Sequence, residues 1–164
     1  MLSFFMAFAK WLQGTWWALD ISGSTWAYPF VQMTHFSGLS LWVGTNVALD
    51  LRLLGIGKKR QTASQLSDAL FAWNWLGFCI AVAGGFMLFA SAATKYISNP
   101  AFEIKFGILI PAGIILHIVN QQKSRTWGQT SETPMAAKLA GLLELLIWFS
   151  VITAAVSIPN YDTH

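Results

Sequence analysis

Three ionisable side chains in this sequence lie within long apolar stretches: His35, His117 and Glu144. An ionisable group is costly to bury in a membrane, and groups of this kind in membrane segments commonly serve a function. The imidazole of histidine ligates metals, including haem iron, and a glutamate can orient that imidazole or carry a proton. If the apolar stretches cross a membrane, these residues predict either metal chemistry or proton handling inside it.

Each histidine shares a predicted helical face with a glycine and an amide side chain. Because glycine has no side chain, a porphyrin can lie against the helix backbone there while the imidazole ligates the iron. This pattern predicts haem b as the cofactor, with His35 and His117 as its metal ligands. The wider cofactor-binding set is Gly38, Trp42, Arg52 and Gly113, with Arg52 near a propionate, and the supporting or relay residues are Glu144, Asn46 and Asn120.

Helix packing is the competing explanation for this pattern. Small residues are ordinary where membrane helices meet, and a histidine can simply hydrogen-bond across helices. At about 1.5 Å per residue, His35 and His117 differ in depth by about 5 to 13 Å, depending on whether depth is counted from the outer or the inner ends of the predicted helices. One haem held by both is therefore permitted but not favoured, and two sites, or sites shared between protomers, stay open.

Glu144 lies close to the inferred depth of His117, which predicts a hydrogen bond between them. A structural glutamate that stays protonated and a proton-relay group are the rival interpretations. Asp50 and Arg52 lie near a helix end, where we expect their side chains to reach toward water.

The composition is that of a membrane protein. Of the 164 residues, 55% are hydrophobic and 10% are charged, whereas a soluble domain carries about 25% charged residues. Nine Trp residues agree, since Trp anchors proteins at the membrane interface. The ten Lys and Arg residues occur in short clusters between apolar runs, so we predict no nucleic-acid partner. The motifs of nucleotide-binding proteins, zinc proteases and serine hydrolases do not occur in the sequence.

Charged residues separate the apolar stretches and allow the helices to be counted. A spanning helix needs about 20 apolar residues, and four stretches reach that length. The first 20 residues are apolar but too short to span, so we expect an amphipathic helix lying in the outer interface. The predicted fold is an all-α membrane protein with an interfacial N-terminal segment at 1–20 and a four-transmembrane-helix bundle at 21–160, its helices at roughly 26–54, 69–94, 102–121 and 136–158.

The distribution of basic residues predicts the orientation. In a four-helix chain the first and third loops share a side, and the more basic side is cytoplasmic. One side carries Arg52, Lys58, Lys59, Arg60, Lys123, Arg125 and Lys138, and the other carries Lys10, Lys95 and Lys105. We therefore expect a multi-pass protein of the bacterial inner membrane with both termini in the periplasm.

A set of short motifs runs along the chain: Trp26-x-Tyr28-Pro29, His35-x-x-Gly38-Leu39, Val43-Gly44, Leu49-Asp50-Leu51-Arg52-Leu53-Leu54-Gly55, Trp73, Trp75, Gly77, Asn99-Pro100-Ala101-Phe102, His117 and Lys138-Leu139-Ala140-Gly141. Together they resemble an uncharacterised family of bacterial four-helix inner-membrane proteins, over roughly residues 11–160. The resemblance implies the architecture but no activity, and Glu144 departs from the small or apolar residue expected there. More loosely, the helices with His and Gly are similar to those of haem b membrane cytochromes and copper-resistance membrane domains.

Three functions stay open at this point. The leading hypothesis is a haem b protein that transfers electrons or anchors a membrane redox complex. The first alternative is proton-coupled, metal or solute transport that uses Glu144, His117 and Asn120 as a polar relay. The second is a structural or accessory subunit whose Trp-rich termini bind a larger membrane complex. All three imply contact with the lipid bilayer and a membrane protein partner or homo-oligomer, and none requires the chain to be an enzyme on its own.

Overall fold

The computed structural model describes residues 2–57, 61–127 and 133–161, and this part of the chain is helical without any strand. Lys58, Lys59 and Arg60, which carry much of the predicted orientation signal, lie outside the described residues. In chain order the elements are α1 (Leu2–Gln13), α2 (Trp16–Gly23), α3 (Ala27–Leu53), α4 (Ala63–Ser91), α5 (Ala93–Ile97), α6 (Pro100–Ile104), the π-helical turn η1 (Lys105–Leu109), α7 (Ile110–Trp127), α8 (Met135–Ser157) and the 3₁₀ turn η2 (Ile158–Tyr161). The predicted all-α class is confirmed over these residues.

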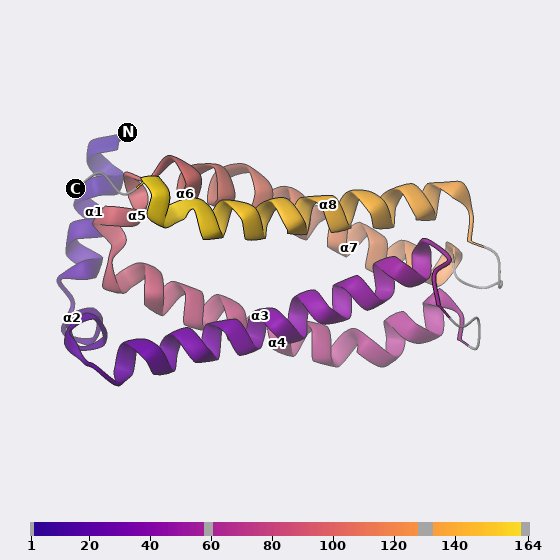
Figure 1. Ribbon diagram of the computed structural model, residues 1–164, viewed down its shortest axis with the longest axis horizontal. Helices are drawn as coiled ribbons and strands as arrows, with labels where there is room; N and C mark the ends of the chain where they lie inside the picture. The colour runs from indigo at the N-terminus through magenta and orange to yellow at the C-terminus, as the bar shows by residue number, and fades with distance from the viewer. Residues whose placement is uncertain (1, 58–60, 128–132, 162–164) are drawn as a thin grey trace.

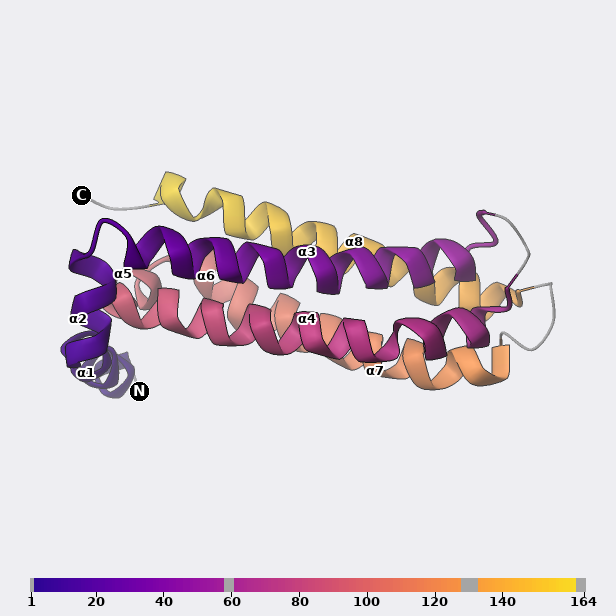
Figure 2. The ribbon, with the colours of Figure 1, turned by 90° about the horizontal axis from the view of Figure 1, so that it is seen from below.

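The long helices lie side by side as two antiparallel hairpins (Figures 1 and 2). One hairpin is α3 with α4, and the other is α8 with the continuous rod formed by α6, η1 and α7. The connections within both hairpins lie at one end of the bundle, and both chain termini lie at the other (Figure 1). The predicted pairing of the first and third loops on one side agrees with this arrangement.

Within the described residues, three helical segments are long and apolar enough to cross a membrane: Ala63–Ser91, Pro100–Trp127 and Met135–Tyr161. The remaining long helix, α3, has 27 residues but is not among them. Its polar side chains explain the difference, because several of them, including Asn46 and Asp50, are buried inside the protein. A hydropathy average counts such residues as if they faced lipid.

The N-terminal segment forms two short helices rather than the single predicted one. A turn at Gly14 separates α1 from α2, and both helices lie across the end of the bundle (Figure 2). One face of α1 buries Ala9 and Leu12 against the end of the α4–α5 region. The Gln13 side chain accepts hydrogen bonds from the backbone N–H and hydroxyl of Thr94, at 3.0 and 2.8 Å. The opposite face exposes large aromatic residues: Phe4, Phe5, Phe8 and Trp11.

The predicted boundaries of two long helices are wrong at their polar ends. α4 begins at Ala63 instead of 69, because Thr62 and Gln65 form a capping box with hydrogen bonds of 3.2 and 3.0 Å. The rod that contains α7 runs to Trp127 instead of 121. Apolar patterns mark only the part of a helix that avoids water, so they miss turns that extend beyond it.

Helices α3 and α4 approach each other backbone to backbone through glycines. A methyl group added at Gly77 would lie 2.7 Å from the backbone nitrogen of Trp42. One added at Gly38 would overlap the backbone of Ala81. Small residues permit this close approach, which is a main source of van der Waals attraction between membrane helices. The competing explanation offered for Gly38, helix packing, therefore accounts for its position.

We expect Gly38→Ala to lower the free energy of unfolding by about 1–3 kcal/mol, the usual cost of overpacking, because backbone atoms block the added methyl. Gly44→Ala on the same helix is the matched control, since nothing lies within 4 Å of its added methyl. Titration of the detergent-solubilised protein with a denaturing detergent measures both. Equal stability of the two variants would show that α3 and α4 do not pack this closely.

Candidate functional site

The interior of the bundle holds a hydrogen-bonded pair between α7 and α8. His117 Nδ1 donates to Glu144 Oε1 at 2.7 Å, and the two side chains are 3% and 1% exposed. Both residues belong to buried stripes that repeat every three or four residues along their helices. The hydrogen bond that their similar depth predicts is therefore present.

Asn74 of α4 joins this pair to α3. Its Oδ1 lies 2.9 Å from His117 Nε2, and its Nδ2 donates to Thr45 Oγ1 at 2.8 Å and to Asn46 Oδ1. Both ring nitrogens of His117 thus have hydrogen-bond partners, one on α8 and one on α4. All four long helices contribute side chains to one polar cluster.

Glu144 receives two further hydrogen bonds. Asn120 Nδ2 donates to Oε2 at 2.5 Å, and Trp148 Nε1 donates to Oε1 at 3.3 Å. Asn120 also donates to the backbone carbonyl of Ala140 at 3.2 Å. With the bond from His117, three donors surround the two oxygens and compensate a carboxylate for the water it has lost.

Asp50 of α3 completes the cluster. Its carboxyl group neighbours that of Glu144, and only 1% of the residue is exposed. Helices α3 and α8 are close together at this point. A methyl group added at Gly141 of α8 would lie 3.1 Å from the backbone oxygen of Asp50. The expectation that Asp50 and Arg52 reach toward water is wrong. Arg52 is 7% exposed, and its Nε donates to the backbone oxygen of Gln61 at 2.8 Å.

An aromatic layer separates the polar cluster from the half of the bundle nearer the termini. The rings of Trp42 and Trp148 pack edge to face with centroids 4.4 Å apart, and Phe78 packs on Trp42 at 4.9 Å. Both Trp side chains stand one helical turn from members of the cluster, on the side of the termini. A methyl group added at Gly113 would lie 3.0 Å from Trp148. Trp42 and Gly113, predicted to bind a cofactor, are thus both used in packing.

His35 lies apart from the cluster, at the contact between α3 and α4. Its Nδ1 donates to the backbone oxygen of Ala81 at 2.7 Å, and its ring rests on Gly85, where an added methyl would lie 2.9 Å from Cε1. His117 bonds to Asn74, which lies on α4 as Ala81 does. From residue 74 to residue 81 the rise along α4 is about 10 Å. The two histidines therefore lie at different depths, within the predicted range.

These positions do not fit a single haem held by both histidines. Both nitrogens of His117 already face hydrogen-bond partners, and the aromatic layer lies between the two rings. Arg52, predicted near a propionate, is about 26 Å along α3 from His35, counted from residue 35 to residue 52. Within the described chain, no group of three or more His, Cys, Asp or Glu side chains is placed to hold a metal ion.

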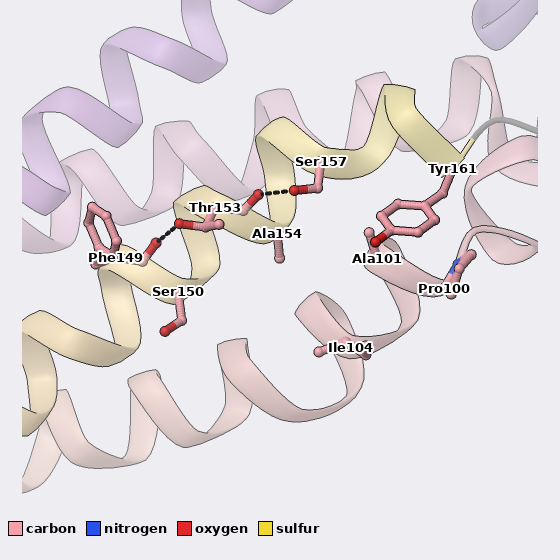
Figure 3. Close-up of a pocket in the computed structure, with 9 residues that line it drawn as sticks. All are labelled: Pro100, Ala101, Ile104, Phe149, Ser150, Thr153, Ala154, Ser157 and Tyr161. Carbon is pink, nitrogen blue, oxygen red and sulfur yellow. Dashed lines mark hydrogen bonds between the residues drawn. The ribbon is translucent and has the colours of Figure 1, made fainter.

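A separate groove lies on the surface between α6 and α8 (Figure 3). Its volume is about 490 Å³, and Ile104, Phe149 and Tyr161 contribute to its mainly apolar lining. The hydroxyls on its α8 side are satisfied within the helix: Thr153 donates to the Phe149 carbonyl at 2.9 Å, and Ser157 to the Thr153 carbonyl at 2.8 Å (Figure 3). No ionisable member of the polar cluster lines this groove, so the candidate site is the cluster.

Three members of the cluster are not among the site residues predicted from the sequence: Thr45, Asp50 and Asn74. Asn74 had a recognisable signal, because it stands between two Trp residues in a stretch without charges. A buried amide in a membrane needs a partner for the same reason that a charge does. Asp50 had none, since its position near the end of α3 is equally compatible with exposure to water.

Fold and site together define the class: over its described residues the protein is helical, with three helices suited to cross a membrane and a buried polar cluster. The chain belongs to DUF6644, a family of unknown function that matches residues 10–159. No curated protein and no solved structure matches the chain. The predicted membership of a family without an established function is confirmed, and the looser similarity to cytochromes and copper-resistance domains is not shown. The function must be argued from the site.

We expect Asn74→Ala to lower the free energy of unfolding by about 1–3 kcal/mol, because it leaves buried partners on α3 and α7 without hydrogen bonds. Asn160→Ala is the matched control, since Asn160 is exposed and surface substitutions usually change stability by less than about 0.5 kcal/mol. The same detergent unfolding titration measures both variants. A loss no larger for Asn74 than for Asn160 would contradict its role in joining the helices.

Proposed function

We propose that this chain is a four-helix protein of the bacterial inner membrane that carries protons through its buried cluster as part of proton-coupled transport. The supporting observation is the buried His117–Glu144 pair, with the buried carboxyl group of Asp50 as its neighbour. Ionisable groups inside membrane segments are rare and typical of proton relays. Hydrogen-bonded imidazole and carboxyl groups are also the side chains best suited to accept and release a proton near neutral pH.

Helix α3 is the fourth spanning helix in this proposal. Its 27 residues give about 40 Å of helix, more than the ~30 Å hydrocarbon core of a bilayer. It runs alongside α4 for most of its length (Figures 1 and 2). The face of α3 that is not buried exposes apolar side chains, among them Phe30, Met33 and Phe36. Lipid would meet this face, while the polar residues of α3 turn toward the cluster.

The cluster is closer to one end of the bundle than to the other. Asp50 stands within one turn of the end of α3, near the connection to α4, whereas the layer of Trp42 and Trp148 covers the cluster on the side of the termini. This asymmetry favours proton exchange with the end that carries the connections. Rearrangement of the aromatic layer would expose the cluster to the opposite side, as alternating access requires.

The proposed orientation places the connections in the cytoplasm and both termini in the periplasm. Basic residues of the described chain near the connections, including Arg52, Lys123 and Arg125, support this assignment by the positive-inside rule. The exposed aromatic face of α1 is suited to lie in the outer interface. Contact with the lipid bilayer follows from this topology, and a membrane protein partner or homo-oligomer stays a prediction.

We expect Glu144→Gln to abolish pH-driven proton flux, because glutamine is close to glutamate in size and shape but cannot exchange a proton. The measurement is the fluorescence of a pH-sensitive dye sealed inside liposomes that contain the purified protein, after a pH step outside. Glu103→Gln is the matched control, since it makes the same chemical change at an exposed position on α6. Wild-type flux should persist in this control.

Two results would count against the proposal. Flux equal to that of empty liposomes in the wild type would remove proton transport. Flux that survives Glu144→Gln would remove the cluster as the route. In either case, co-purification of a membrane partner that also survives His35→Ala and His117→Ala would favour the accessory-subunit hypothesis.

Haem b binding is the second candidate, and one observation favours it. Because Nδ1 of His35 bonds to the Ala81 carbonyl, Nε2 keeps a lone pair that could ligate a metal, as in many ligating histidines. His117 offers no comparable nitrogen. A haem would therefore depend on His35 and not on both predicted ligands.

For this candidate the test is a reduced-minus-oxidised spectrum of protein expressed with excess haem. If a haem is bound at His35, His35→Ala should remove the α-band and His117→Ala should retain it. A band that depends on both residues would restore the original two-ligand hypothesis. A featureless spectrum for the wild type would remove haem altogether and leave the proton-transport proposal standing.

A further inference from the structure

Asp50 is the one carboxyl group of the cluster that receives no compensating donor. No N–H or hydroxyl group of the described residues donates to either of its oxygens, although the residue is 1% exposed. The carboxyl group that it does contact is that of Glu144. The Oδ1 of Asn120, which is 0% exposed, likewise has no donor in the described part of the chain.

Two carboxylates are acceptors only, so a hydrogen bond between them requires a proton on one of the two. Glu144 already accepts from His117, Asn120 and Trp148, which suits it to the ionised form. Asp50 has no donors, and an ionised carboxylate without them is expensive to bury. The proton therefore belongs on Asp50, whose O–H donates to Glu144.

We propose that Asp50 and Glu144 form a proton-binding site in which Asp50 carries the proton and Glu144 accepts its hydrogen bond. The site rests on the proposed function only for its role in transport, because proton binding itself follows from the burial of the Asp50 carboxyl group without any donor. It adds Asp50 to the proton path at the end nearer the connections. A proton that leaves Asp50 would pass to Glu144, the carboxyl group to which His117 donates its hydrogen bond.

Ionisable groups on each of the four long helices have partners other than Asp50. On α3 itself, Arg52 donates from Nε to the Gln61 backbone. On α4, Asp68 is exposed and pairs with Arg125 of α7 at 3.3 Å. On α7 and α8, His117 and Glu144 bond to each other. No described cation therefore makes an ion pair with Asp50, in agreement with a neutral carboxyl group.

A sodium ion is the alternative occupant, since it also favours carboxylate and amide oxygens. It requires several oxygens spaced around it, whereas two carboxyl groups in hydrogen-bond contact are spaced for a proton. The sodium ion would have to separate Asp50 from Glu144 and would leave both in the ionised form. The two occupants therefore differ in whether a protonated carboxyl group is present.

Infrared spectroscopy of the full-length protein in lipid vesicles distinguishes these states, because a protonated carboxylic acid has a C=O stretching band that a carboxylate lacks. At neutral pH we expect such a band in the wild type, its loss in Asp50→Asn, and a shift without loss in Glu144→Gln. Asp20→Asn is the matched control, since Asp20 is exposed and its replacement should leave the band unchanged. Circular dichroism verifies that each variant is folded.

Chemical labelling of the unmodified wild type avoids any folding defect of the variants. A lipid-soluble carbodiimide reacts with protonated carboxyl groups in apolar surroundings, and mass spectrometry of the digested protein locates the product. We expect labelling at Asp50, unaffected by sodium chloride and absent at the exposed Glu103.

Three results would overturn the inference: no protonated band in the folded wild type, a band that survives in folded Asp50→Asn, or a band and label that sodium removes. The first two show that Asp50 carries no proton, and the third assigns the site to sodium. A band with the expected dependence but no proton flux in liposomes would retain the site and reject transport. Proton flux without the infrared band would retain transport and reject the site.

Discussion

A polar side chain in the interior of a membrane protein must find its hydrogen-bond partners within the protein, because lipid offers none. By insertion scales, one charged residue at the middle of a spanning helix costs about 2.5–3.5 kcal/mol. Glu144 would impose that cost alone, but it is surrounded by N–H groups from His117, Asn120 and Trp148. The four long helices contribute to the same cluster because each carries a polar residue that has the same requirement. The cluster thus determines both how the helices face one another and where chemistry is possible.

The close contact of α3 and α4 makes this cluster geometrically possible. Asn and Thr side chains are short, so they reach across a helix interface only when the backbones are near each other. Gly38 and Gly77 provide that proximity, and Asn74 then bonds to Thr45 on the opposite helix. Helix packing and proton handling are therefore not rival interpretations of these residues. Gly38, first considered as part of a haem site, brings the backbones close enough, together with Gly77, for the polar side chains to meet.

The two histidines have separate environments, so the chemistry open to one differs from the chemistry open to the other. His117 is hydrogen-bonded at both nitrogens, whereas His35 bonds to a backbone carbonyl through one nitrogen on the other side of the Trp42–Trp148 layer. A bis-histidine cofactor site needs two rings with free nitrogens at one depth. A proton relay needs titratable groups in hydrogen-bond contact, which is what His117 and Glu144 provide.

The amino-acid sequence is sufficient to predict the all-helical class, the apolar helices, the pairing of loops at one end and the shared depth of His117 and Glu144. These follow from local quantities: the length of apolar runs, the spacing of charges and the rise of an α-helix. Three features emerge only when the helices are packed together: Asp50 is buried beside Glu144, Asn74 joins the helices, and His35 lies apart from the cluster. The face that one helix presents to another depends on packing between residues far apart in the chain. Neither hydropathy nor helical periodicity contains that information.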